Sequence, residues 1–196
     1  MGRVRSTSVL LLAGCAAACT NFHAVEPGRL YRSAQPDAEC LRAWVPEHEL
    51  RTIVQLRGTD PDEESRAILE HADVEVVRIP MSARAYPTRE QLVQLWDAFA
   101  SIEYPALVHC RAGADRTGLA AAIYVLQRTG DLDRARRELA LAYGHTGWGT
   151  NRLDRVLEMY GRWHGRMDFR RWASTLYHPP GAYRAQRARA AEGLSP

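Results

Sequence analysis

Lysine is absent from this chain, and all 26 of its basic residues are arginine. Because the bias runs through the whole sequence, it does not mark any one site. The formal net charge is only +3, and no long basic run precedes the C-terminal tail, so the chain lacks the electrostatic pattern of a nucleic-acid-binding protein. It also has no internal repeat and no cluster of side chains at metal-ligand spacing. We therefore expect no nucleic-acid partner, no metal and no cofactor.

Long hydrophobic runs are missing as well. The apolar run at 9–12 is far too short to span a bilayer. Arg3 and Arg5 precede it, and small residues lead from it to Cys15. This arrangement resembles a bacterial lipoprotein signal, which implies that Cys15 is lipidated and anchors an exported protein to the periplasmic side of a membrane. The alternative is a cytoplasmic protein with a mis-chosen start codon or an untidy N-terminus.

Cysteine is scarce, with four residues in the chain. If Cys15 carries lipid, Cys19, Cys40 and Cys110 remain. Cys19 and Cys40 could form a disulfide in an oxidising compartment, which leaves Cys110 free. The alternative is that Cys19 and Cys40 are two unpaired structural thiols.

A length of 196 residues suits one compact domain. We expect a signal and linker at 1–28, one domain at 29–178 and a flexible tail at 179–196. Apolar runs predict strands at 52–56, 74–79 and 106–108, and these alternate with segments of helical pattern. Such alternation predicts an α/β fold with a mostly parallel central sheet, helices on both faces and a helical C-terminal part. The expected helices begin at Asp37, Pro61, Thr88, Gly118, Asp131, Asn151 and Met167.

Two details of the C-terminal half can be tested against a structure. We expect 131–142 to form one helix, followed by a glycine-rich turn at 143–150. We also expect Asn151 and Asp154 to form a capping pair at the start of the next helix.

The chemistry is concentrated in one stretch, 109–118, which reads His-Cys-Arg-Ala-Gly-Ala-Asp-Arg-Thr-Gly. A strand leads into it and a helix leads away, so the backbone N–H groups of 111–116 are expected to form an anion-binding nest at a helix N-terminus. The same positive end lowers the pKa of Cys110 and favours its thiolate. Arg116 adds a planar pair of donors that suits two oxygens of a phosphate. The expected substrate-binding residues are Arg111, Ala112, Gly113, Ala114, Asp115 and Arg116.

This Cys-x5-Arg loop, preceded by His109 and followed by Thr117 and Gly118, resembles the signature of cysteine-dependent protein tyrosine and dual-specificity phosphatases. The segment Tyr-Arg-Ser-Ala-Gln-Pro at 31–36 resembles the opening of bacterial and fungal members of that superfamily. The resemblance implies a phosphomonoester hydrolase that needs no metal. Cys110 would attack phosphorus and Thr117 would donate to the sulfur as it leaves.

The resemblance also assigns supporting roles. Arg116 would stabilise charge on the phosphoryl oxygens, and His109 would order the loop by hydrogen bonds rather than transfer protons. Gly113 would allow a tight turn, and Gly118 would allow close packing of the following helix. We expect Arg32 to be a structural ion-pair residue and not a substrate contact.

One feature departs from the family pattern. The general-acid Asp of the family would fall at 81–87, where this chain has no Asp or Glu. A leaving group must still be protonated. Asp115 is the candidate acid, and the alternative is that Asp115 accepts hydrogen bonds from loop N–H groups. Asp60 is the reserve candidate.

The substrate stays open at this point. The first hypothesis is a phosphorylated protein, with phosphotyrosine and also phosphoserine or phosphothreonine as targets. The second is an inositol phosphate or phosphoinositide, for which Arg57, Arg84 and Arg111 could supply positive potential. A third is a catalytically silent module that binds phosphorylated ligands, and sulfur transfer is more remote. Tyr86 and Trp148 either line the rim of the pocket or pack their loops onto the core.

Overall fold

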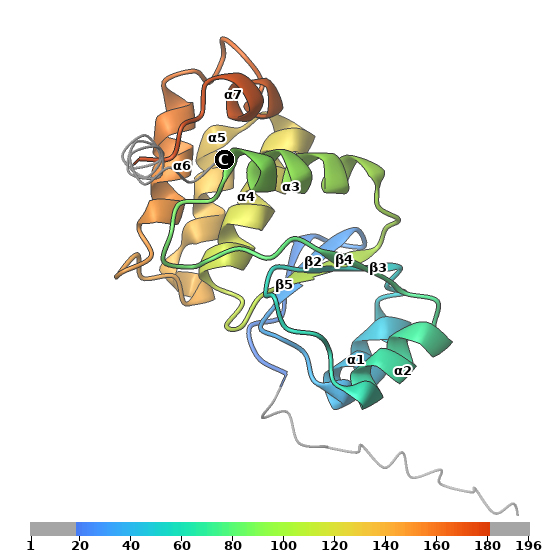
Figure 1. Cartoon of the computed structure of the whole chain (residues 1–196). Coiled ribbons are helices and arrows are strands. Elements are labelled where there is room, and N and C mark those ends of the chain that lie inside the picture. The colour runs from blue at the N-terminus through green and yellow to red at the C-terminus, as the bar shows by residue number, and fades with distance from the viewer. Residues whose placement is uncertain (1–18, 181–196) are drawn as a thin grey trace, which may run out of the picture.

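The computed structural model describes residues 19–180, and its sheet has five strands in the order β1-β2-β5-β3-β4 (Figure 1). The β1–β2 pairing is antiparallel, and the other three pairings are parallel. The expected mostly parallel sheet is therefore confirmed. The strands are β1 (His23–Glu26), β2 (Leu30–Ser33), β3 (Thr52–Gln55), β4 (Glu75–Arg78) and β5 (Ala106–His109).

Helices cover both faces of this sheet, as predicted (Figure 1). Two helices lie on one face, and the remaining helices form the helical C-terminal part on the other. The two are α1 (Ala38–Glu47) and α2 (Glu63–His71). The others are α3 (Arg89–Ser101), α4 (Asp115–Thr129), α5 (Leu132–Arg136), α6 (Arg152–Gly161) and α7 (Phe169–Thr175).

Successive side chains of the central strands point to opposite faces of the sheet, and this divides the core into two clusters. On β3, Ile53 joins the smaller cluster under α1 and α2, while Val54 joins the larger one. On β5, Leu107 and Val108 divide in the same way. Successive side chains of a strand point to opposite faces, so strands buried on both faces need apolar residues throughout.

Helix α4 is the central helix of the larger layer, and its residues 117–126 are all buried. Its close packing depends on Gly118. A Cβ at this position would come within 2.8 Å of the Glu138 carbonyl oxygen and of a Leu139 methyl carbon. Glycine therefore allows the turn at 137–139 to lie directly against the start of α4, as the sequence suggested.

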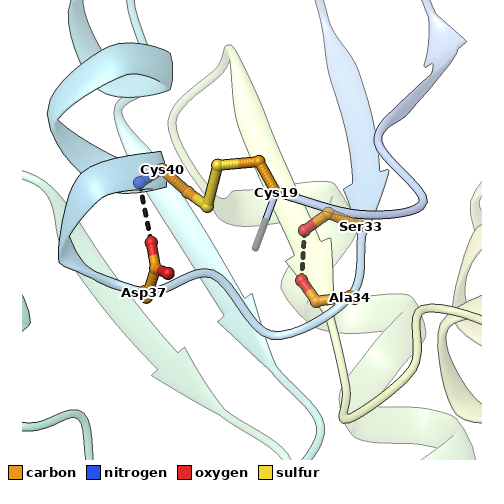
Figure 2. Close-up of a disulfide and its surroundings, with 5 residues drawn as sticks. All are labelled: Cys19, Ser33, Ala34, Asp37 and Cys40. Carbon is orange, nitrogen blue, oxygen red and sulfur yellow. Dashed lines mark hydrogen bonds between the residues drawn. A yellow bond between two sulfur atoms is a disulfide. The ribbon is translucent and has the colours of Figure 1, made fainter. Parts of the chain in front are cut away.

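The segment at 20–28 is not the linker that we expected. It contains β1, which pairs with β2, and it is tied to α1 by a disulfide between Cys19 and Cys40 (Figure 2). The pairing of these two cysteines is thereby resolved in favour of the disulfide. Asp37 caps α1 by accepting from the Cys40 N–H at 2.9 Å, so the bridge begins at an ordered helix N-terminus.

The expected single helix at 131–142 is wrong. Helix α5 ends at Arg136, and two short 3₁₀ turns follow, η1 (Arg137–Leu139) and η2 (Leu141–Tyr143), separated by an extended Ala140. The helix is interrupted because of a contact with a residue outside 131–142. Arg32 donates to the Glu138 carbonyl oxygen at 2.8 Å, which gives this carbonyl a partner other than a further helical turn.

The expected capping pair at the start of α6 is also wrong. The Asn151 side chain makes no cap hydrogen bond, and its backbone already has helical dihedral angles. Asp154 is engaged by His145, with His145 Nε2 2.9 Å from its Oδ1. A long-range partner has thus taken the carboxylate that the local pattern assigned to capping.

Several expectations concern residues that are not described. The proposed signal and Cys15 lie outside 19–180, and so does the part of the tail beyond Pro180. Within 19–180, no helix combines the length and the apolar character needed to cross a membrane.

Candidate active site

The 109–118 stretch forms a strand, a loop and a helix start, in that order. Strand β5 ends at His109, and α4 begins at Asp115. Cys110 is the first residue after the strand and is only 2% exposed. The loop lies at the carboxyl end of the middle strand of the sheet, the edge where ligands bind in such folds.

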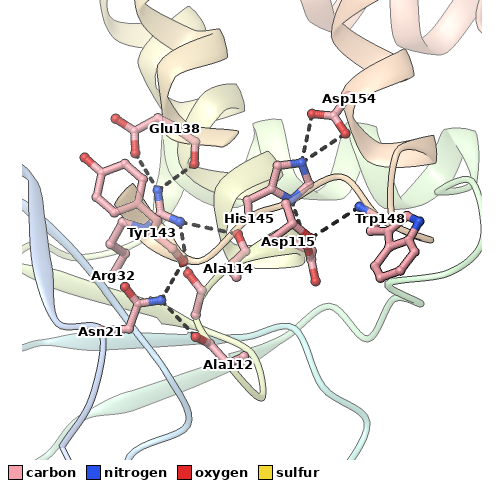
Figure 3. A network of polar contacts seen from close by, with 12 residues as sticks. Asn21, Arg32, Ala112, Ala114, Asp115, Glu138, Tyr143, His145, Trp148 and Asp154 are labelled. Carbon is pink, nitrogen blue, oxygen red and sulfur yellow. Dashed lines mark hydrogen bonds and ion pairs between the residues drawn. The ribbon is translucent and has the colours of Figure 1, made fainter. Parts of the chain in front are cut away.

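Arg32 holds one side of this loop, and its guanidinium lies beside Ala114 and Tyr143 (Figure 3). Its Nη2 donates to the Gly113 carbonyl oxygen at 2.9 Å and to the Ala114 carbonyl oxygen at 3.4 Å. Its Nη1 donates to Glu138 Oε2 at 2.8 Å, and its guanidinium lies 3.9 Å from the ring centre of Tyr143. The side chain is fully buried. The structure thus places Arg32 as a structural ion-pair residue, as the sequence suggested, and gives it the further task of holding the loop.

The first two carbonyls of the loop, those of Arg111 and Ala112, accept hydrogen bonds from two other groups. Asn21 Nδ2 donates to the Ala112 carbonyl oxygen and to the Tyr143 carbonyl oxygen, both at 2.9 Å. The Gln35 backbone N–H donates to the Arg111 carbonyl oxygen at 3.2 Å. Four consecutive loop carbonyls, those of 111–114, are therefore bonded to groups outside the loop.

These bonds fix the direction of the loop N–H groups. A planar trans peptide points its C=O and the next N–H in opposite directions, so outward carbonyls at 111–114 turn the N–H groups of 112–115 inward. A ring of inward N–H groups is an anion nest. Gly113 makes the turn possible, because its φ is +70° and a Cβ would lie 2.5 Å from the Ala34 nitrogen.

The groups around the Cys110 thiol shift its ionisation toward the thiolate. Burial by itself raises the pKa of Cys110, but hydrogen bonds from the Thr117 side chain and backbone, the charge of Arg116 and the Ala112 N–H together bring it below the ordinary value of 9.0. Sulfur, guanidinium and loop amides therefore lie close enough to act on one another. A thiolate is the reactive form of cysteine as a nucleophile.

Two buried polar atoms beside the sulfur have no nitrogen or oxygen partner within 19–180. They are Arg116 Nε and the Thr117 hydroxyl. Arg116 makes one contact, from Nη1 to the Met81 carbonyl oxygen at 3.3 Å. Buried donors usually have acceptors. A bound oxyanion would supply the acceptor that Arg116 lacks, and the sulfur is the partner of the Thr117 hydroxyl.

His109 is placed to order the loop and not to carry charge. Burial lowers its pKa to about 4, so the ring is neutral near pH 7. Its Nδ1 lies 3.4 Å from the Cys110 carbonyl oxygen. The position agrees with the supporting role that the sequence suggested.

Asp115 takes part in a network that the sequence analysis did not foresee (Figure 3). Its Oδ1 lies 2.6 Å from His145 Nδ1, and the other ring nitrogen faces Asp154. The Asp115 side chain is 25% exposed, while that of His145 is 3% exposed. The carboxyl of Asp115 is paired with an imidazole, a partner that neither hypothesis for this residue included.

The other positions considered for an acid, 81–87 and Asp60, lie outside the loop. The segment 81–87 meets the loop through the main chain of Met81, which accepts from Arg116. Asp60 has a side chain that is 74% exposed and pairs with Arg78 at 3.2 Å. Asp115 is therefore the carboxyl that the structure places within the loop itself.

The candidate rim residues differ in their surroundings. Arg57 Nη1 donates to Gln35 Oε1 at 2.7 Å, so it is already engaged. Arg84 and Arg111 are exposed, and Tyr86 is half-buried. Trp148 is 94% exposed, which excludes packing of its side chain onto the core.

Asn21 and His145 are the site residues that sequence reasoning missed. Asn21 fell in the segment taken as a linker, and no local pattern connects it with Ala112, 91 residues away. His145 stands in the turn at 143–150 between two glycines in the left-handed region, Gly144 and Gly147. The glycines around His145 were the one signal available for it, because they predict a turn, but they give no sign that the turn lies beside Asp115.

Comparison with known proteins places this geometry in a family. The model of a family described as DSP-PTPase phosphatase fused to NAD+ kinase matches residues 16–150. The dual specificity protein phosphatase TpbA of Pseudomonas aeruginosa is 37% identical over 105 residues in strain UCBPP-PA14, covering 53% of this chain and 45% of the relative. In strain PAO1 it is 34% identical over 131 residues, covering 66% and 56%. The chain spans about half the length of these curated relatives.

Two solved structures resemble this chain over a larger share of its length than the curated relatives do. The crystal structure of P. aeruginosa TpbA gives a TM-score of 0.60 at 26% identity, covering 74% of this chain and 91% of that one. The catalytic core of the PP-IP phosphatase Siw14 from S. cerevisiae, in complex with citrate, gives a TM-score of 0.56 at 19% identity, covering 90% and 94%. The second likeness concerns the fold alone.

Replacing Arg32 by Met should cost about 3 kcal/mol of unfolding free energy, because it leaves Glu138 without its buried partner and removes the donor to two loop carbonyls. It should also weaken the binding of inorganic tungstate, measured by calorimetry. The matched control is Arg42→Met at the exposed ion pair with Glu64, which should change stability by less than about 1 kcal/mol. Equal losses in the two variants would contradict the role given to Arg32.

Replacing Thr117 by Ala should raise the pKa of Cys110, because the hydroxyl is a donor that stabilises the thiolate. The thiolate forms as pH rises through this pKa, so the midpoint of iodoacetate alkylation should lie below pH 9.0 in the wild type and move upward in the variant. Alkylation at Cys110 would be followed by mass spectrometry. Thr175→Ala on α7 is the control and should leave the midpoint unchanged.

Proposed function

Since the chain belongs to the DSP-PTPase phosphatase family, we propose that it hydrolyses phosphomonoesters through a cysteinyl-phosphate intermediate and acts first on phosphotyrosine, and also on phosphoserine and phosphothreonine, in proteins. The observation that carries this proposal is the combination, in one loop, of a Cys110 thiol whose pKa is lowered and a set of carbonyls held outward so that the amides face inward. The relatives named dual specificity phosphatases support the protein substrate.

In the first step the Cys110 sulfur attacks phosphorus, a P–S bond forms, and the P–O bond to the leaving group breaks. The amides of 112–115 and the Arg116 guanidinium stabilise the charge on the phosphoryl oxygens. In the second step water attacks phosphorus and the P–S bond breaks. The Thr117 hydroxyl donates to the departing sulfur, as it does to the thiolate.

The leaving oxygen needs a proton, and we assign Asp115 as its donor. Within 19–180 the hydrogen bond of this carboxyl to His145 is at Oδ1, which leaves Oδ2 to serve as the acid. In the second step the carboxylate would take a proton from the attacking water and return to its starting state. The absence of any Asp or Glu from 81–87 supports this assignment.

A second candidate substrate is an inositol phosphate or phosphoinositide. Arg111 and Arg84 are exposed, the first on the loop itself and the second on the segment that contacts Arg116 through Met81. Such side chains suit a ligand with several phosphates. The fold likeness to a PP-IP phosphatase is compatible with this candidate.

The decisive experiment is a substrate panel with the full chain and its Cys110→Ser variant. We expect the wild type to release phosphate from a phosphotyrosine peptide, more slowly from a phosphoserine peptide, and the variant to release none because it lacks the nucleophile. Turnover of inositol phosphates alone would favour the second candidate. Binding without turnover of any substrate would contradict the enzymatic proposal and favour a silent phospho-ligand module.

The same panel tests Asp115. An acid must be protonated to act, so wild-type kcat should fall on the alkaline side of the pH profile, and Asp115→Asn should lack this fall and have lower turnover. A variant with the turnover and pH profile of the wild type would exclude Asp115 as the acid.

We also propose that the protein is exported and lipid-anchored through Cys15. The Cys19–Cys40 disulfide supports export, because such bridges persist in oxidising compartments. In a bacterial host, wild-type protein should be recovered with membranes and incorporate labelled fatty acid, whereas Cys15→Ala should do neither. Cys110→Ala is the control and should behave as the wild type. Recovery of the wild type in the soluble fraction without label would contradict the proposal.

A further inference from the structure

His145 occupies an unusual position for a buried titratable side chain, because carboxylates face both of its ring nitrogens (Figure 3). Nδ1 lies 2.6 Å from Asp115 Oδ1, at the start of α4. Nε2 lies 2.9 and 3.0 Å from the two oxygens of Asp154, in the first turn of α6. These are the charged groups within hydrogen-bond distance of the ring among the described residues.

The backbone holds the ring in this place. The His145 N–H donates to the Ala140 carbonyl oxygen at 3.3 Å, which ties the residue to the 3₁₀ turn before it. Gly144 has a φ of +78° and ends that turn. The main chain that carries the ring is therefore held by a short, hydrogen-bonded turn.

The two hydrogen bonds of His145 fix the number of protons between the ring and its carboxyl partners, and a proton on the other oxygen of Asp115, Oδ2, is a third. A neutral imidazole has one N–H donor and one acceptor nitrogen, while an imidazolium has two donors. Two hydrogen bonds to carboxyl groups thus contain two protons, either as an imidazolium between two carboxylates or as a neutral imidazole with one carboxylic acid. The two forms differ by the movement of one proton along one hydrogen bond.

We propose that His145 is a positioning residue that prepares Asp115 to protonate the leaving group, and that Asp154 holds His145 in the form that donates from Nδ1. The inference rests on the proposed function and deepens it. Nδ1–H would bind Oδ1 and direct Oδ2 toward the leaving oxygen. His145 and Asp154 would then replace the support that an acid on 81–87 would have received from its own loop.

Asp115 and His145 together account for the protons that move in the two steps. In the first step the Asp115 Oδ2–H bond breaks and an O–H bond forms on the leaving group, which takes the electrons of the broken P–O bond. The negative charge that remains on Asp115 faces the Nδ1–H donor of His145, which stabilises it. In the second step Asp115 takes one proton from water, the hydroxide oxygen joins phosphorus, and the P–S bond breaks so that Cys110 leaves as a thiolate.

Leaving groups of different acidity distinguish this role from a structural one. Phenol is a poor leaving group and needs an acid, whereas 4-nitrophenol leaves readily as an anion. For His145→Gln we expect kcat/KM for phenyl phosphate to fall at least about tenfold more than for 4-nitrophenyl phosphate. Asp154→Asn should show the same selectivity to a smaller extent.

Two further variants sharpen the test. The side-chain amide of Asn can replace a donor near Nδ1, and that of Gln can replace one near Nε2, so His145→Asn should retain more activity toward phenyl phosphate than His145→Gln. Adding His145→Gln to Asp115→Asn should cause little further loss, because both act on one proton transfer. His164→Gln, which removes an imidazole bonded to the Gly130 carbonyl oxygen, is the control and should leave both rates unchanged.

The outcomes are distinct. Equal losses on both esters in folded His145→Gln and Asp154→Asn, or no loss on either, would show that His145 is only structural and would overturn the inference while leaving the phosphatase intact. If His145→Gln does not fold, Asp154→Asn and His145→Asn apply the same criterion. A wild type that hydrolyses neither ester would instead overturn the proposed function, and the inference with it.

Discussion

The orientation of four peptide groups determines whether this protein has an anion site. The carbonyls of 111–114 point away from the centre of the loop because Gln35, Asn21 and Arg32 bind them, and their N–H partners therefore point inward. The donors come from segments 81 and 91 residues away along the chain in two of these contacts. The loop is thus not a local motif that folds by itself, since its chemistry depends on the N-terminal segment that lies beside it.

That N-terminal segment is stabilised by features that have no contact with the sulfur. The disulfide joins Cys19 to α1, and Phe22 packs with its ring centre 4.4 Å from that of Trp44. Asn21 lies between them in the left-handed region, at φ +57°, which asparagine tolerates better than most residues. Tyr143 links this segment to Arg32, because it accepts from Asn21 and lies against the guanidinium. Two residues of α1, Cys40 and Trp44, therefore hold the segment at 19–22 in place. This segment contacts the loop through Asn21.

Sequence patterns predicted the parts of the structure that depend on local geometry. The strands β3 and β5 follow from short apolar runs, and the placement of Cys110 and Arg116 between a strand and a helix start follows from the same local pattern. The failures all involve distant partners. The helix expected at 131–142 is interrupted where Arg32 binds the Glu138 carbonyl, and the expected cap at Asp154 is taken by His145. The contact of Asn21 with the loop could not be predicted from the sequence, since it exists only because the chain folds so that the segment before β1 lies beside the loop.

The position of Asp115 also explains why a histidine is needed there. A carboxylate beside Arg116 would repel an incoming phosphate dianion and weaken the guanidinium's attraction for it. Placing a proton on the carboxyl, or an N–H donor against it, removes most of this penalty. In the proposed mechanism His145 is that donor, with its Nδ1 2.6 Å from Asp115 Oδ1, and Asp154 faces the other ring nitrogen with a side chain that is 30% exposed. The proposed network would allow one loop to contain both an anion site and an acid, two features that would otherwise oppose each other.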